Sequence, residues 1–105
     1  MPSGRNGFIS RELRYQASKM VNICDEELLG KTLTEGKLKV SISHDYFSGA
    51  RVDEETAIAQ IRETEIASLV GNRIVARALK EKLAHPRAVR KIQDVSFLMI
   101  YKFSV

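Results

Sequence analysis

The last strand-like segment of the chain constrains the fold most, because it is apolar on two faces. If residues 96–103 are extended, alternate side chains form two faces: Phe97, Met99, Tyr101 and Phe103 on one, and Leu98, Ile100 and Lys102 on the other. Helices on one side of a small sheet cover only one face. The segment therefore predicts either a homodimer through Phe97–Phe103 or a central strand that neighbouring side chains and loops shield.

A period-two pattern marks another strand at residues 37–43. Leu38, Val40 and Ile42 alternate there with lysine and serine residues. This alternation predicts a strand whose three apolar residues face the core and whose polar residues face water. Further strands are expected at 8–15, 19–24 and 89–92, with turns at 16–18 and 93–94.

A first helix is expected to begin just after Asp53. This residue is a suitable N-cap, and the two glutamates after it suit the positive end of the helix dipole. The spacing predicts that Ala57, Ile58 and Ile61 form the buried stripe of this helix.

A second helix is expected over residues 65–83, where apolar residues recur at helical spacing. Gly71-Asn72 interrupts this pattern, and Pro86 ends it because proline disfavours a helical residue before it. A shorter helical turn is expected at 25–29, with Asp25 as its N-cap and Gly30 as its stop.

These elements together predict an α+β fold. We expect a two-layer sandwich with a mainly antiparallel sheet of four or five strands and two main helices on one face. The 105 residues fit one domain, expected over residues 8–105. Residues 1–7 contain two glycines, one proline and one serine, and are expected to form a disordered tail.

Composition limits the cellular context. The sequence has no run of about 18 apolar residues, so no membrane-spanning segment is expected. The first residues lack the apolar stretch of a secretory signal. A single cysteine, Cys24, excludes an internal disulfide. These features favour a cytoplasmic protein.

Basic residues are concentrated in one part of the chain. The net charge is +4, and residues 66–93 contain seven basic residues and one acidic residue. Such clusters release counterions from a phosphate backbone, so RNA is a legitimate partner. The alternative is that Arg73, Arg77, Lys80 and Lys82 form the solvated face of a helix.

The loop after the alternating strand adds to the RNA hypothesis. It contains Tyr46, Phe47 and Arg51 behind a strand with two lysines, and aromatic residues beside cations stack unpaired bases. The alternative is that Tyr46 and Phe47 cap the core. The candidate RNA contacts are Lys37, Lys39, Phe47, Arg51, Arg87, Arg90 and Lys91.

Signals for phosphate-loop or cysteine chemistry are weak. Gly30-Lys31-Thr32 resembles the end of a phosphate-binding loop, but Asp25 stands where that motif needs its first glycine. Cys24 lies next to Asp25, and a neighbouring carboxylate raises a thiol pKa. Neither feature predicts a catalytic residue.

Hydrolase and metal signals are equally weak. His44, Asp45 and Ser48 are the residue types of a triad, but a triad normally draws them from separate elements. One cysteine and two histidines show none of the usual ligand spacings. No catalytic residue, metal site or cofactor is therefore assigned.

Four segments carry a family resemblance: 24–31 (CDEELLGK), 46–49 (YFSG), 52–55 (VDEE) and 69–71 (LVG). Over about residues 20–103 the chain resembles an archaeal family, domain of unknown function 424. The resemblance implies a two-layer α/β sandwich in the archaeal cytoplasm and leaves the activity open. Its motif residues here are Cys24, Asp25, Gly30, Lys31, Tyr46, Gly49 and Gly71.

The chain departs from the family pattern at two places. Ser68 stands where the family usually has asparagine, and Phe97-Leu98-Met99 replaces a stretch like His-Ala-Gln. If that histidine serves a function in relatives, this protein lacks it.

Three functional hypotheses follow from the sequence. The first is a non-enzymatic RNA- or ribosome-associated binding module. The second is a protein-interaction module that acts as a homodimer or a complex subunit. The third is an enzyme acting on a small molecule, which would need a deep pocket beside Cys24, Lys31 and Tyr46.

Overall fold

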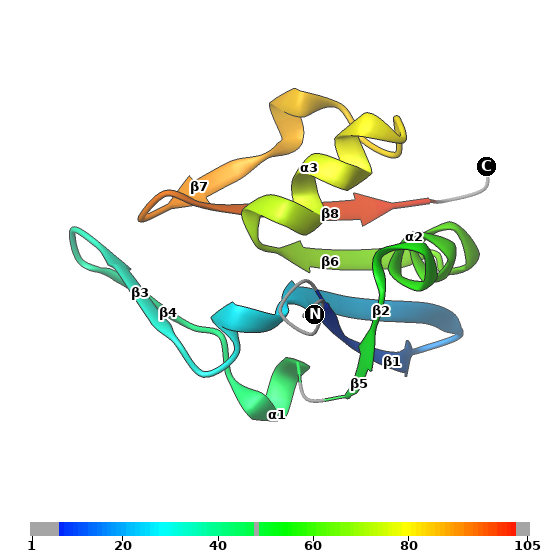
Figure 1. The fold of residues 1–105 in the computed structure, drawn as a ribbon, viewed down its shortest axis with the longest axis horizontal. Coiled ribbons are helices and arrows are strands. Elements are labelled where there is room, and N and C mark those ends of the chain that lie inside the picture. Colours follow the sequence, from blue (N-terminus) through cyan, green and yellow to red (C-terminus); the bar gives the residue numbers. More distant parts are fainter. Residues whose placement is uncertain (1–6, 48, 103–105) are drawn as a thin grey trace, which may run out of the picture.

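The computed structural model describes residues 7–47 and 49–102, and the fold is α+β (Figure 1). The elements in chain order are β1 (Phe8–Tyr15), β2 (Ser18–Asp25), the 3₁₀ turn η2 (Glu26–Leu28), β3 (Thr32–Glu35), β4 (Leu38–Ser41), α1 (His44–Phe47), β5 (Ala50–Val52), α2 (Glu54–Glu63), β6 (Ile66–Val70), α3 (Asn72–Lys80), the 3₁₀ turn η3 (Pro86–Ala88), β7 (Arg90–Ile92) and β8 (Val95–Tyr101).

Six strands form one mixed sheet in the order β5-β1-β2-β6-β8-β7, and β3 and β4 form a separate hairpin. Every pairing in the large sheet is antiparallel except that of β2 with β6, which is parallel. The expected sheet of four or five strands is therefore too small and too simple. The α+β class is confirmed, and α2 and α3 lie over the same face of the large sheet (Figure 1).

The expected helix over residues 65–83 is wrong in its first part. Ile66–Val70 is a strand whose five residues are all buried, and it lies between β2 and β8. A strand whose side chains are buried on both faces has no polar alternation, so its apolar run resembles a buried helix. Gly71, with φ of 129°, marks the change from strand to helix, and α3 begins at Asn72.

The first helix agrees with its sequence signals. The Asp53 Oδ1 atom accepts a hydrogen bond from the Thr56 N–H at 2.8 Å. Ala57, Ile58 and Ile61 are buried in the core, as the spacing predicts.

The segment with period-two alternation, residues 37–43, contains β4 of the separate hairpin and is not part of the large sheet. This corrects a second expectation. Leu38 is 50% exposed near the hairpin tip, Val40 is half-buried, and Ile42 is buried. The hairpin projects from the body of the molecule, so only its base reaches the core (Figure 1). The apolar residues alternate as predicted, but their burial decreases from Ile42 at the base of the hairpin to Leu38 near its tip.

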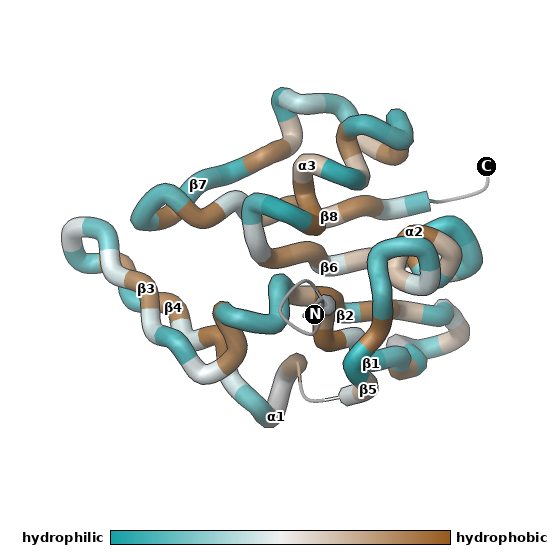
Figure 2. Tube along the Cα trace, in the orientation of Figure 1, coloured by the Kyte–Doolittle hydropathy of each residue, from teal (hydrophilic) through white to brown (hydrophobic). Residues whose placement is uncertain are grey.

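Two apolar clusters lie on opposite faces of the large sheet. The larger one joins α2 and α3 to side chains of β2, β6 and β8, including Val21, Leu69 and Leu98. The smaller one joins Cys24 and Val70 to Leu33, Ile42 and Phe47 of the hairpin and α1. Figure 2 shows hydrophobic stretches along β6 and β8, in the middle of the molecule. The smaller cluster covers only one end of its face.

The two ends of the chain only partly match their sequence predictions. Gly7, expected in a disordered tail, is buried, and its carbonyl accepts hydrogen bonds from the Arg73 Nη2 and the Glu26 N–H. Residues 1–6 and Phe103 lie outside the described part of the chain.

Among the residues that the structure describes, none of the helices is long and apolar enough to span a membrane.

Candidate functional site

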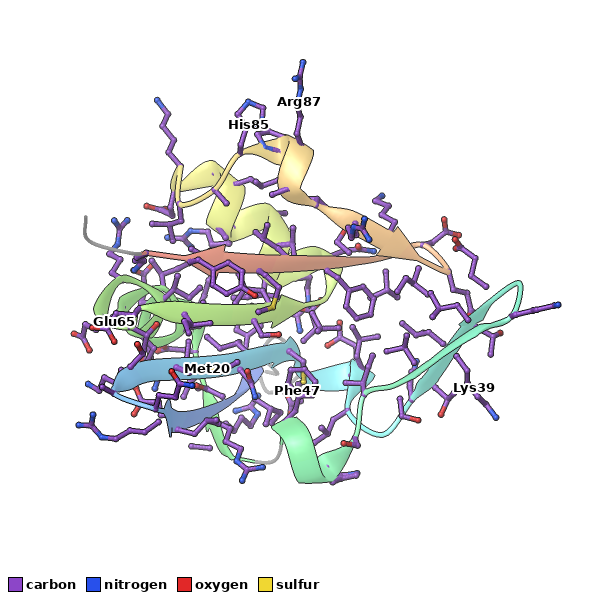
Figure 3. The ribbon with its side chains drawn as sticks, turned by 180° about the vertical axis from the view of Figure 1, so that it is seen from behind. Met20, Lys39, Phe47, Glu65, His85 and Arg87 are labelled. Atoms are coloured by element: carbon purple, nitrogen blue, oxygen red, sulfur yellow. The ribbon has the colours of Figure 1, made fainter. Side chains whose placement is uncertain are left out.

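The sheet face opposite α2 and α3 is open around the C-terminal half of β8. The register places Met99 and Tyr101 on this face, beside Ser68 and Ile66 of β6. Met99 is 41% exposed and Tyr101 is 55% exposed. Figure 3 views this face from behind, with Met20 of β2 on the same surface.

The strand register places two arginine residues on this open face. By register, Arg90 of β7 lies beside Phe97, and Arg11 of β1 lies beside Asn22 of β2. Among the strand positions of β1, β2, β6, β7 and β8 whose side chains the structure describes, this face carries no carboxylate. An apolar surface with aromatic residues and cations therefore lies open to solvent.

A second cluster forms where β2 ends against the start of α3. The Asp25 carboxylate is buried and accepts two backbone hydrogen bonds, from the Arg73 N–H and the Ile74 N–H, both at 3.0 Å. The expected role of Asp25 as cap of 25–29 is wrong, because its side chain makes no cap bond to η2. Asp25 instead caps α3, and it occupies the place where a helix N-terminus binds an anion.

Gly71 makes this arrangement possible. A Cβ atom at this position would lie 2.2 Å from the Asp25 Cγ atom. Two family-motif residues that are distant in sequence are therefore in direct contact, and the contact explains why the site needs a glycine.

Arg73 belongs to the same cluster and contacts both Glu27 and Phe8. Its guanidinium donates to both carboxylate oxygens of Glu27, at 2.7 and 3.1 Å, and lies 4.7 Å from the centre of the Phe8 ring. The Arg73 hydrogen bond lowers the pKa of Glu27. Burial raises the pKa of Asp25, against the hydrogen bonds from residues 73 and 74 that lower it. The cluster stabilises the start of α3, and its own carboxylates neutralise its cation.

Cys24 precedes this cluster and is fully buried. Burial raises the pKa of its thiol to about 12, and the charges of Asp25 and Glu27 add to the effect. A thiol that stays protonated near neutral pH is a poor nucleophile. Cys24 therefore has a packing role.

We expect Cys24 in the native protein to resist a thiol reagent such as dithionitrobenzoate at pH 8, because its thiol is protonated and inaccessible. Denaturation in 6 M guanidinium chloride should release one reactive thiol per chain, in keeping with the single cysteine. The measurement is absorbance at about 412 nm before and after denaturation. Full labelling of the native protein within minutes would contradict the buried position.

The other motif residues shape the base of the hairpin. The Gly30 N–H donates to the Ile42 carbonyl at 2.7 Å, and the Ile42 N–H donates to the Lys31 carbonyl at 2.8 Å. Lys31 itself is exposed. A Cβ atom on Gly49 would lie 2.0 Å from the Ser10 carbonyl oxygen, so this glycine permits a close backbone approach. Tyr46 belongs to α1, and its side chain lies outside the described structure.

Comparison with known proteins decides the family. The model of the family described as "Protein of unknown function (DUF424)" matches residues 13–103. The chain belongs to the DUF424 family. The resemblance inferred from the four sequence segments is therefore confirmed.

A solved structure supports the fold of this DUF424 chain. It is described as an uncharacterized conserved protein from Methanopyrus kandleri, and the match has a TM-score of 0.77 at 18% identity. The alignment covers 94% of this chain and 96% of that chain. At this identity the likeness concerns the fold alone. No protein with a curated description matches the chain.

The candidate RNA residues of this DUF424 chain do not form one surface. Lys37 and Lys39 lie at the hairpin, Arg87 lies in η3, and Arg90 and Lys91 point to opposite faces of β7. Figure 3 shows Lys39 and Arg87 on separate projections of the molecule. The sequence candidates therefore converge on no single groove.

Two of those candidates have structural roles. Phe47 is only 4% exposed and packs in the smaller cluster, so its ring cannot stack on a base. This confirms the alternative that Phe47 caps the core. The Arg51 Nε donates to the Glu26 Oε2 at 2.9 Å.

The open face around Met99 and Tyr101 was not among the RNA candidates taken from the sequence. The sequence signal for it was the two-sided apolar pattern of residues 96–103.

Two of the four residues expected on the solvated face of the second helix form ion pairs. Arg73 pairs with Glu27, and Arg77 pairs with Glu54, Glu55 and Glu81. Ion pairing therefore leaves fewer uncompensated basic side chains in residues 66–93 than the sequence suggests.

Within the described residues, no group of three histidine, cysteine, aspartate or glutamate side chains is placed to hold a metal ion.

Proposed function

We propose that this protein is a non-enzymatic module that binds single-stranded RNA on the open face of its large sheet. The observation that carries the proposal is the exposed apolar pair Met99 and Tyr101 on β8, with Phe97 and Arg90 in register beside them. The proposed RNA-binding surface therefore lies on β8 and not on the loop around Phe47.

Single-stranded RNA fits this surface for three reasons. Unpaired bases stack on exposed aromatic rings, and Tyr101 supplies such a ring. Arginine side chains attract the phosphate backbone, and the register places Arg90 of β7 on this face. The protein as a whole carries a net charge of +4, which favours encounter with a polyanion.

The test is a salt-dependent titration of a fluorescent single-stranded RNA of mixed sequence with the full chain. Tyr101→Ala is expected to weaken binding by about 1–3 kcal/mol, or roughly 5- to 160-fold, because one stacking platform is lost. Leu38→Ala is the matched control, since Leu38 is similarly exposed but lies on the hairpin. Binding should weaken as salt rises. The proposal fails if the wild type shows no salt-sensitive affinity, or if both variants bind equally well.

A second candidate function is protein interaction through the same face, either as a homodimer or as a complex subunit. Its support is that two of the three exposed large apolar side chains in the described structure, Met99 and Tyr101, adjoin each other on β8. Light scattering over a hundredfold range of concentration separates the two functions. A dimer that Tyr101→Ala dissociates would favour interaction, whereas a monomer that binds RNA would favour the first proposal.

A further inference from the structure

β8 loses its outer neighbour part-way along its length. β7 pairs with β8 only from Val95 to Phe97, whereas β6 pairs with β8 from Phe97 to Tyr101. If β7 extended backward in the same register, Ala88 would lie opposite Met99. Ala88 and Val89 instead donate their N–H groups to the carbonyls of His85 and Pro86, at 2.9 and 3.2 Å. The turn η3 therefore leaves a gap in the sheet beside Met99.

The backbone of Met99 faces this gap. The Gly71 N–H donates to the Ser96 carbonyl and the Lys102 N–H donates to the Glu65 carbonyl, both at 2.8 Å. Residues of an antiparallel strand bond alternately to the neighbour on one side and on the other. Even-numbered residues of β8 therefore face β6, and Met99 directs its N–H and C=O outward.

A hollow of about 290 Å³ lies at the gap. Its lining residues are Ala88, Arg90, Phe97, Leu98, Met99 and Tyr101. The volume is near the lower limit of roughly 300 Å³ for small-ligand sites, so it suits one ring system and not a whole chain segment. Two aromatic residues, one guanidinium and one outward-facing peptide donor and acceptor meet there.

We infer that this hollow binds a single unstacked base of the RNA, an inference that rests on the proposed function. Tyr101 stacks on the base, the Met99 N–H and C=O bond to its polar edge, and Arg90 contacts the adjoining phosphate. The site thus gives a base preference to a surface that otherwise binds RNA without regard to sequence.

A peptide strand fits the gap less well than a base. Among the described residues, the edge of β8 beyond β7 runs only from Leu98 to Tyr101, and only Met99 and Tyr101 direct their backbone outward there. The turn that contains Ala88 also closes one end of the hollow.

The test uses the full chain with fluorescent hexamers of adenylate, cytidylate and uridylate. Ala88→Leu fills the hollow, and Ala76→Leu is the matched control, because Ala76 is equally small and exposed but lies on α3 beside a different hollow. The wild type is expected to prefer one hexamer at least tenfold. Ala88→Leu should abolish this preference, and Ala76→Leu should retain it. The matching mononucleotide should shift the Met99 amide resonance only when the hollow is unfilled.

The outcomes distinguish the two proposals. Equal binding of the three hexamers by the wild type, or an unchanged preference in Ala88→Leu, overturns the base site and leaves the RNA function standing. If no hexamer binds, the RNA function fails, and the base site, which rests on it, fails as well. A dimer that Ala88→Leu converts to a monomer assigns the hollow to a second copy and overturns the base site.

Discussion

Gly71→Ala is expected to lower the free energy of unfolding by more than about 3 kcal/mol. At φ of 129° and ψ of 145°, Gly71 occupies a backbone region that is essentially restricted to glycine, and a side chain there costs on the order of 1–3 kcal/mol. The new Cβ atom would also lie 2.2 Å from the Asp25 Cγ atom, so the carboxylate would have to leave the N-terminus of α3. The measurement is urea denaturation followed by circular dichroism.

Gly36→Ala is the matched control for this change. Gly36 also has a positive φ, of 61°, but a Cβ atom there would meet nothing within 4 Å. Its substitution should cost about 1–2 kcal/mol, which is the backbone term alone. Equal losses at the two glycines would contradict the contact between Gly71 and Asp25.

Asp25→Ala is expected to cost about 2–4 kcal/mol of unfolding free energy. The change leaves the N–H groups of Arg73 and Ile74 without their acceptor in a part of the molecule that water reaches poorly. Each unsatisfied buried group costs about 1–3 kcal/mol. Denaturation in urea measures the loss, and hydrogen exchange at residues 73 and 74 should accelerate in step with it.

Asp53→Ala provides the comparison for a helix cap in water. Asp53 is exposed and accepts one backbone bond, from Thr56. Its replacement should cost about 1 kcal/mol, the usual value for an exposed N-cap. If Asp25→Ala cost no more than Asp53→Ala, the buried cap of α3 would be only a surface interaction.

The elements that depend on a local pattern of residue types could be predicted from the sequence. The strand at 8–15 has the expected bounds, and Asp53 caps the first helix through a bond to a residue three positions later. Both features depend on neighbours in the chain, which a local pattern records. The α+β class followed from them.

Features that depend on distant neighbours could not be predicted. Residues 66–70 contain apolar residues at helical spacing, and only the pairing with β2 and β8 makes them a strand. Asp25 has the residue type of a cap, but the helix that it caps begins far along the chain. Local sequence thus indicated that Asp25 caps a helix and could not indicate which helix.

The candidate site shows the same limit. The two-sided apolar pattern of residues 96–103 marked β8 as unusual, and the open face around Met99 and Tyr101 agrees with that signal. The gap beside Met99 arises because η3 draws Ala88 away, which no pattern within β8 records. Phe47 satisfied a sequence pattern for stacking and is used in the core.

The parallel pairing of β2 with β6 has a consequence for how quickly the chain reaches its native state. Met20 pairs with Ile66, so all the intervening chain must be closed into a loop before the central pair can form. Closure of a long loop costs entropy that its contacts repay only afterwards. We therefore expect this encounter to limit the folding rate, which should lie between those of helical bundles and all-β proteins, while the β1–β2 hairpin is expected to form within microseconds.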